Sequence, residues 1–217
     1  MTTDATDVDA AGPGTPGLLA RLASPEPGGG ADDPAARILD AALAEFETYG
    51  LRRVSVEDVA RRAGVARTTV YRRFGTKDGL LQAVILREVR RFLTAIARAT
   101  EGLATPEDAV VEGFVAGLQG ARRHPLMRRV LESEPETLLP QLGMNGGAVL
   151  VAARDVLAGR LRRARPADAA DHDAVAEVLV RLAASLLLVP GGGLPLEEDD
   201  DIRAFARDYL TRMLHRP

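Results

Sequence analysis

Apolar residues recur at three- and four-residue spacing through most of the chain, which is the pattern of amphipathic helices. The first such pattern predicts a helix over residues 34–49 that ends at Gly50. The next begins at Ser55, whose hydroxyl and the carboxylate of Asp58 have capping-box spacing, and ends at Gly64. Two short helices bury too little apolar surface to stay folded alone, so we expect a third helix to complete a small core.

The third helix is predicted over residues 67–74, RTTVYRRF, where Val70 and Phe74 lie four residues apart. Two short helices on a tight turn that contains glycine form a helix-turn-helix. The remaining side chains of this helix donate hydrogen bonds of the kind that bases and phosphates accept. These donors are Arg67, Thr68, Thr69, Tyr71, Arg72 and Arg73. We interpret the segment as a recognition helix; the alternative is a basic face exposed to solvent.

A long helix is predicted from Thr76 onward, about 22 residues and roughly 33 Å in length. Its first turn presents Lys77 and free backbone amides, an arrangement suited to a DNA phosphate. Its later turns carry an apolar stripe that includes Phe92. This helix would bridge two domains, so a ligand at its far end would tilt the near end and move the recognition helix.

From Thr105 onward we expect a second all-helical domain, with helix breaks near Pro125, Pro135, Pro140 and Gly143. Short, interrupted helices pack less tightly than long ones, so this region would enclose a cavity; the alternative is an ordinary apolar core. No buried charge or polar cluster identifies a particular ligand, and the expected effector is a small hydrophobic or amphipathic molecule. The predicted lining residues are Phe92, Phe114, Leu118, Met127, Leu131, Leu138, Leu142 and Met144.

Three further helices are predicted, over residues 144–163, from Asp171 or Asp173 to Val189, and from Ile202 onward. The arginines of RLRRAR suit the C-terminus of the first of them, and we favour this interpretation over a second DNA-binding patch. The last two helices carry more apolar surface than one chain would bury, which favours a homodimer. The predicted interface residues are Val178, Leu182, Leu186, Phe205, Tyr209 and Met213.

Composition supports a helical DNA-binding protein. Aromatic residues make up only 4% of the 217 residues and Trp is absent, while Ala, Leu, Val and Arg dominate. The net charge of −3 hides a basic block over residues 34–98, with thirteen Lys or Arg against seven Asp or Glu. The absence of cysteine excludes disulfides and thiolate metal sites and fits a reducing cytoplasm. No segment has the pattern of a signal peptide or of a membrane span, so no membrane partner is expected.

No catalytic, cofactor or metal site is predicted. His124, His172 and His215 lie far apart in sequence and, apart from the aspartates beside His172, have no partner at metal-ligand spacing. A solvated loop and a helix N-terminus explain the acidic run at 197–201. The chain has no glycine-rich phosphate loop with lysine, no serine in a nucleophile elbow and no paired-carboxylate pattern that demands an enzyme. An enzyme is therefore the weakest hypothesis.

Two blocks of the sequence resemble the tetracycline-repressor (TetR) family of one-component regulators. ILDAALAEFETYG at 38–50 is similar to the first helix of that family, and VSVEDVARRAGVARTTVYRRFGTKDGLLQAV at 54–84 is similar to its second, third and early fourth helices. The resemblance implies effector binding in the C-terminal domain and a dimer formed by a four-helix bundle. Some members bind a divalent metal between effector helices, which we do not expect here.

Carried over position by position, the resemblance also implies DNA contacts. Phosphate contacts would come from Ser55, Tyr71 and Lys77, and base contacts from Arg67, Thr68 and Thr69. This chain has Thr68 where many members have Gly, and Arg73 where many have His or Tyr. The base preference of other members therefore does not transfer to this chain.

The sequence thus predicts an all-α protein with a disordered tail over residues 1–32, a three-helix DNA-binding domain over 33–79, and an effector-binding and dimerisation domain over 80–217. We expect a ligand-responsive repressor that binds a palindromic, double-stranded DNA operator as a homodimer. The alternative is a helical small-molecule-binding or interaction protein whose helix-turn-helix is vestigial. The intact set of phosphate donors argues against this alternative, because a vestigial reader has no reason to keep them.

Overall fold

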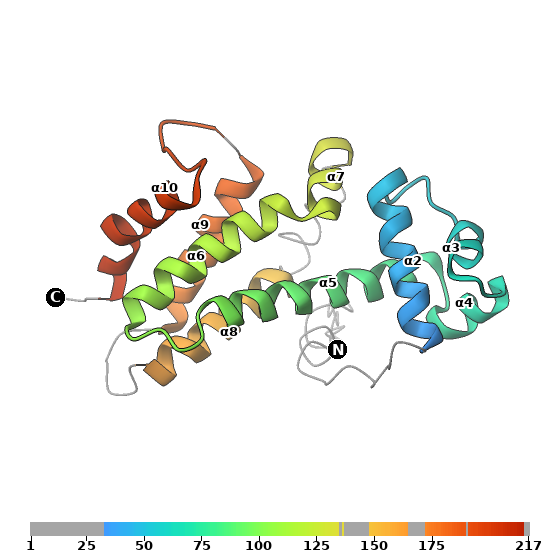
Figure 1. The fold of residues 1–217 in the computed structure, drawn as a ribbon, viewed down its shortest axis with the longest axis horizontal. Helices are drawn as coiled ribbons and strands as arrows, with labels where there is room; N and C mark the ends of the chain where they lie inside the picture. Colours follow the sequence, from blue (N-terminus) through green and yellow to red (C-terminus); the bar gives the residue numbers. More distant parts are fainter. Residues whose placement is uncertain (1–32, 135, 137–147, 165–171, 190, 215–217) are drawn as a thin grey trace, which may run out of the picture.

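The computed structural model describes residues 33–134, 136, 148–164, 172–189 and 191–214. Within these residues the chain is helical and contains no strand, which confirms the predicted all-α class. Figure 1 shows α2, α3 and α4 gathered at one end of an elongated molecule, here called the head, and the later helices forming the rest of it, here called the body, with α7 next to α2. The predicted tail over residues 1–32 lies outside the described residues.

The helices of the described residues follow the predicted order. Their bounds are α2 Pro34–Tyr49, α3 Val56–Ala63, α4 Arg67–Phe74, α5 Lys77–Ala99, α6 Pro106–Arg123, α7 Pro125–Ser133, α8 Ala148–Ala164, α9 His172–Leu188 and α10 Asp199–Phe205. In Figure 1, α5 runs from the head into the body, where α6 lies beside it. α5 is therefore the bridging helix that the sequence predicts.

Side-chain caps start α2, α3 and α5 where the sequence predicts these helices to begin. Asp33 Oδ1 accepts a hydrogen bond from the amide of Ala35 at 2.9 Å, at the start of α2. Ser55 and Asp58 form both bonds of the capping box at the start of α3. The hydroxyl of Thr76 accepts a bond of 3.0 Å from an amide in the first turn of α5. Each cap pairs an amide that the first turn would otherwise leave unsatisfied.

An apolar core joins the three helices of the head. Phe46 of α2 and Val59 of α3 are fully buried, and Val70 of α4 is 1% exposed. The left-handed backbone at Gly64, with φ 65° and ψ 36°, turns the chain between α3 and α4. The turn and the shared core together hold α4 at a set angle to the rest of the head.

Two helices of the body also enter the head core. Leu80 and Val84 of α5 are 1% and 0% exposed, and they belong to the same cluster as the head residues. Leu126 and Val130 of α7, which the chain reaches only after α6, are buried in that cluster as well. α5 and α7 therefore connect the head to the body through packed side chains and not only through the covalent chain.

A second core lies in the body, mainly between α6, α9 and α10. Val111 and Leu118 of α6 are each 1% exposed, and Ile202 of α10 is fully buried. The last helix begins at Asp199, three residues before the predicted start, because Asp199–Asp201 form a first turn whose negative charges suit a helix N-terminus. After Phe205 the chain continues as a π turn and then as a 3-10 turn that ends at residue 214.

None of the helices in the described part of the chain has both the length and the apolar character that crossing a bilayer requires.

Replacing Gly50 by Ala is expected to lower the free energy of unfolding of the head by about 2–3 kcal/mol. Gly50 ends α2 with φ 85° and ψ 165°, a backbone region that is essentially restricted to glycine. An added Cβ would also lie 2.5 Å from Oε1 of Glu134, a buried carboxylate of the body. Thermal unfolding followed by circular dichroism measures the loss.

Gly64→Ala is the matched control for this substitution. Gly64 also has positive φ, but nothing lies within 4 Å of an added Cβ. The expected cost is therefore only the conformational term, about 1 kcal/mol. Equal losses for the two variants would show that the contact between Gly50 and Glu134 does not constrain the head.

Candidate DNA interface and effector cavity

The recognition helix α4 presents a polar, basic face. Val70 anchors it in the head core, and Phe74 packs partly against the same core. Four arginine and threonine side chains on the opposite face are exposed to solvent: Arg67, Thr68, Arg72 and Arg73. Tyr71 is 36% exposed, and Thr69 is half-buried. The structure therefore brings the predicted base-contacting residues together in the first turn of α4, at one surface.

Arg67 is held by two neighbouring side chains. Its Nη2 donates a hydrogen bond of 3.2 Å to the hydroxyl of Tyr71, and its guanidinium carbon lies 5.1 Å from the centre of the Tyr71 ring. It also forms an ion pair with Glu57 of α3. The hydrogen bond to Tyr71 and the charge of Glu57 raise the pKa of Arg67 above its ordinary value. A base contact by Arg67 would replace the ion pair with Glu57.

Ser55 and Lys77 already have partners within the chain. The Ser55 hydroxyl donates to Asp58 Oδ2 at 2.6 Å, and this hydrogen bond is the main cause that lowers the pKa of Asp58. Lys77 Nζ donates to the carbonyl of Arg52 at 3.0 Å, which leaves two of its three protons for a phosphate. Ser55 thus acts as a helix cap, and a phosphate contact from its hydroxyl would cost the bond to Asp58.

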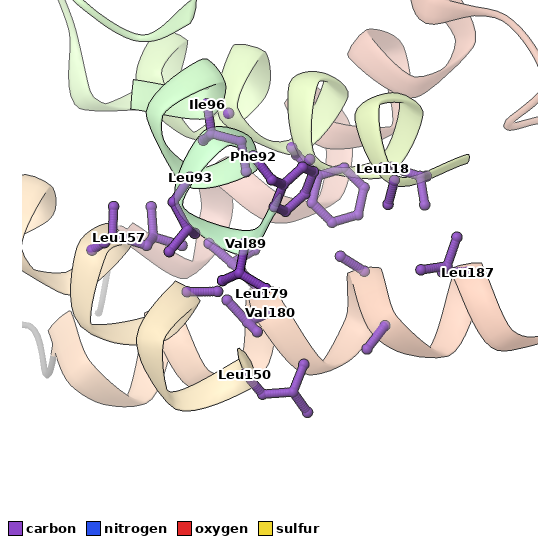
Figure 2. Close-up of a pocket in the computed structure, with 18 of the residues that line it drawn as sticks. Val89, Phe92, Leu93, Ile96, Leu118, Leu150, Leu157, Leu179, Val180 and Leu187 are labelled. Carbon is purple, nitrogen blue, oxygen red and sulfur yellow. The ribbon is translucent and has the colours of Figure 1, made fainter. Parts of the chain in front are cut away.

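A cavity of about 280 Å³ lies in the body beside α5. Figure 2 shows that its wall is almost entirely aliphatic and aromatic, with Val89, Phe92, Leu93 and Ile96 of α5 lying among residues of α6, α8 and α9. The labelled residues of those three helices are Leu118, Leu150, Leu157, Leu179, Val180 and Leu187. Gly117 of α6 lies opposite Ile96 of α5. A Cβ atom at this position would be in van der Waals contact with the Ile96 side chain, at 3.7 Å, so the glycine leaves this space to the cavity.

Four of the eight residues predicted to line the cavity do so: Phe92, Phe114, Leu118 and Met127. Leu131 does not line it; this residue lies at a separate hollow with Gln119, Arg122 and Glu197, because it follows Val130, which lines the cavity, by one position and so lies on another side of α7. Leu138, Leu142 and Met144 lie outside the described residues. The contribution of α8 and α9 to the wall was not predicted.

Two polar pairs line the cavity, one beside the middle of α5 and one at the C-terminal end of that helix, and sequence reasoning missed both. Towards the head, Glu88 and His124 line it, with Glu88 Oε2 3.4 Å from His124 Nε2. Burial alone would raise the pKa of Glu88, but the hydrogen bond from His124 and the charges of Arg91 and Arg87 lower it overall. At the other end, Thr100 and Arg160 line the cavity and are joined by a hydrogen bond.

Comparison with known proteins identifies the family. Residues 38–84 match the family model "Bacterial regulatory proteins, tetR family", and residues 106–207 match "Bacterial Tetracyclin repressor, C-terminal domain". The regulator Mb2274c of Mycobacterium bovis is 30% identical over 141 residues, which cover 63% of this chain and 72% of the relative. The chain belongs to the TetR family. This confirms the family that the two sequence blocks predict.

Other TetR-family proteins resemble this chain over most of its length. The regulator Rv1255c of Mycobacterium tuberculosis is 28% identical over 177 residues, or 81% of this chain and 82% of the relative. Among solved structures, the TetR family repressor AlkX from Dietzia sp. strain DQ12-45-1b, described as implicated in biodegradation of n-alkanes, is 25% identical with a TM-score of 0.63. That likeness covers 86% of this chain and 98% of AlkX. The chain is thus a TetR-family transcriptional regulator with a helix-turn-helix.

In this TetR-family regulator, the residues predicted for the dimer interface fall into two groups. Val178 of α9 is 47% exposed, Tyr209 is 61% exposed and Met213 is 37% exposed. Leu182, Leu186 and Phe205 are half-buried against the core of the body. The Phe205 ring lies between those of Phe114 and Tyr209, with centroids 6.2 and 5.2 Å away. The exposed group offers apolar surface that the single chain does not cover.

Proposed function

We propose that this TetR-family regulator represses transcription by binding a palindromic operator as a homodimer, and that a small apolar or amphipathic molecule in the cavity releases it. This proposal is supported by α5 and α7, because residues of both helices pack in the head core and also line the cavity. We assign DNA binding to residues 33–79, and effector binding and dimerisation to residues 80–217, with Leu80 and Val84 of α5 packed into the head.

On the DNA side, the first turn of α4 would enter the major groove. Arg67, Thr68 and Thr69 would contact base edges, as the first residues of a recognition helix do. Tyr71, Arg72 and Lys77, with Ser55 when it gives up its cap, would contact phosphates. A two-fold dimer would place two such helices roughly 34–36 Å apart, one turn of DNA. The expected operator is therefore an inverted repeat.

On the effector side, the cavity wall reaches the head core. Leu126 and Val130 of α7 line the cavity and are also buried in the head, as is Leu81 of α5 in part. A molecule that enters between α5 and α7 would therefore displace side chains that are packed in the head core. Packed cores respond to such displacements by switching between discrete arrangements, because their packing is not continuously deformable.

Two hydrogen bonds to the backbone of Arg52 connect α7 to Lys77, a predicted phosphate contact. Glu134, at the end of α7 and 8% exposed, accepts a hydrogen bond of 3.4 Å from the amide of Arg52. The carbonyl of Arg52 accepts the bond from Lys77. A shift of α7 would therefore act on Lys77 through a single residue of the loop between α2 and α3.

Lys77→Ala is expected to weaken binding to all duplexes about equally. The loss of one phosphate contact should reduce the slope of log affinity against log salt concentration by about one for each half-site. Thr69→Ala should instead change the preference at one position of the half-site, by about 1–3 kcal/mol. Fluorescence anisotropy with the operator and single-base variants, over a range of salt concentrations, measures both effects.

Arg98→Ala is the matched control, because it removes a positive charge from the far end of the same helix. Arg98 is exposed on α5, about 30 Å along the helix from Lys77. Its replacement should leave the salt slope unchanged. If Lys77→Ala also leaves the slope unchanged, the start of α5 does not lie at the DNA backbone.

The proposal is tested directly by selection of duplexes from a randomised library with the purified protein. A recovered inverted repeat, released on addition of a ligand, is the expected result. No enrichment at low salt would favour the alternative of a small-molecule binder with a vestigial helix-turn-helix. AlkX is described as implicated in biodegradation of n-alkanes, and the aliphatic wall of this cavity suits an elongated aliphatic effector. Aliphatic compounds are therefore the first ligands to screen.

A further inference from the structure

One cation on the cavity wall has no carboxylate partner in the described part of the chain. Arg160 of α8 lines the cavity, and its hydrogen bond goes to the neutral hydroxyl of Thr100. That hydroxyl is committed to the end of α5, where it donates to the carbonyl of Ile96 at 3.0 Å. A guanidinium does not lose its proton in proteins, so the positive charge persists beside an apolar wall.

Two neighbouring arginines of α8 differ from Arg160 in this respect. Arg154 forms an ion pair with Asp155 at 2.6 Å, and Arg162 forms one with Asp173 at 2.5 Å. The charge of each is therefore balanced within the chain, by an acid of α8 for Arg154 and by an acid of α9 for Arg162. The positive charge of Arg160 is thus the one that a bound molecule would neutralise.

The opposite end of the cavity offers no comparable site for a charged ligand. The carboxylate of Glu88 already has Arg91 at 3.0 Å, Arg87 at 3.3 Å and His124 at 3.4 Å. Its negative charge is therefore neutralised within the chain. The cavity has a clear polarity, with an unneutralised cation at the Thr100 end and balanced charges towards the head.

The wall between these ends is aliphatic and follows α5. From Ile85 to Thr100 the helix rises about 22 Å, and the residues that line the cavity recur on one face over this length. The cavity has a volume of about 280 Å³, and an extended aliphatic chain can lie along this face of α5.

We propose that the cavity binds an aliphatic chain that ends in a carboxylate, with the carboxylate held by Arg160 at the Thr100 end and the chain directed along α5 towards the head. Arginine recognises carboxylates by paired, charge-assisted hydrogen bonds. The chain then points towards Leu126 and Val130, the two α7 residues that the cavity shares with the head core. This inference rests on the proposed function of the cavity as the effector site and names the chemical class of the effector.

The test compares dodecanoate with 1-dodecanol, which has the same chain and no charge, by titration calorimetry on the full chain. An apolar cavity without a cation would favour the alcohol, because an unpaired carboxylate loses its hydration on entry. We expect the wild-type protein to bind dodecanoate roughly tenfold to a hundredfold more tightly than dodecanol. If the wild-type protein binds both compounds equally, or prefers dodecanol, this measurement alone overturns the proposal.

Arg160→Gln should abolish the preference for dodecanoate while leaving dodecanol binding within a few-fold of the wild type. Arg163→Gln, an exposed arginine of the same helix, is the matched control and should keep the preference. Arg160→Lys should restore part of it, since the charge remains but the paired geometry is lost. A preference that survives in Arg160→Gln would place the carboxylate elsewhere and refute the assignment.

Operator release is measured separately, so that the two proposals fail independently. Arg160-dependent binding of dodecanoate without release of the operator would uphold this inference and refute the regulatory role of the cavity. Release of the operator by dodecanol and dodecanoate alike, with equal affinities, would uphold the regulatory role and refute the role of Arg160.

Discussion

Val178→Asp is expected to yield a monomer that binds the operator roughly a hundredfold more weakly than the wild-type protein. Val178 is 47% exposed on α9, within the apolar surface that the single chain leaves uncovered. In a two-fold dimer the same patch of both subunits meets, so the substitution would bury two carboxylates without partners. The second half-site contact is then lost. Analytical ultracentrifugation and operator anisotropy at matched concentrations give the two readouts.

The choice of Val178 follows from burial. Leu182 and Leu186 belong to the same predicted interface, but both are half-buried against the core of their own chain. A charge there would also destabilise the body, so loss of binding would have two causes. Leu103→Asp is the control, because Leu103 is 38% exposed in the loop between α5 and α6. A Val178→Asp protein that remains a dimer would move the interface away from α9.

Phe46→Ala is expected to lower the free energy of unfolding of the head by about 3–5 kcal/mol. Phe46 is among the largest fully buried side chains, and it lies at the centre of a small core. The loss combines the removed apolar surface with the cavity left behind, and a few kcal/mol is a large part of the stability of a small domain. Operator binding at physiological temperature should therefore be lost.

Tyr49→Ala serves as the matched substitution for Phe46→Ala. Tyr49 is an aromatic residue on the same helix, but it is 53% exposed. The expected cost is within about 0.5 kcal/mol. Hydrogen exchange of the α2, α3 and α4 amides reports on the head alone and separates its opening from that of the body. Similar losses of protection in the two variants would show that Phe46 does not hold the head together.

The predicted helix break near Pro125 is confirmed, the predicted breaks near Pro140 and Gly143 lie outside the described residues, and the packing partners of the helices were not predicted. The break at Pro125 separates α6 from α7 as the sequence indicates, because proline lacks the amide that a continuing helix needs. The insertion of Leu126 and Val130 into the head core was not predictable from that break. Nothing in the periodicity of nine residues distinguishes packing on α2 from packing on α5 or α9. The same limitation placed Leu131 in the cavity, where the structure does not have it.

The sequence by itself determined the family and the helices of the head. The caps at Asp33, Ser55 and Thr76 are contacts within three residues, so local spacing is sufficient to predict them. Only the tertiary structure decided which arginine of the RLRRAR segment and its neighbours lines the cavity. Arg160 and Arg163 look alike as local sequence, but only Arg160 faces Thr100, sixty positions earlier in the chain. Burial and charge compensation depend on such distant neighbours, and these are set by the packing of whole helices.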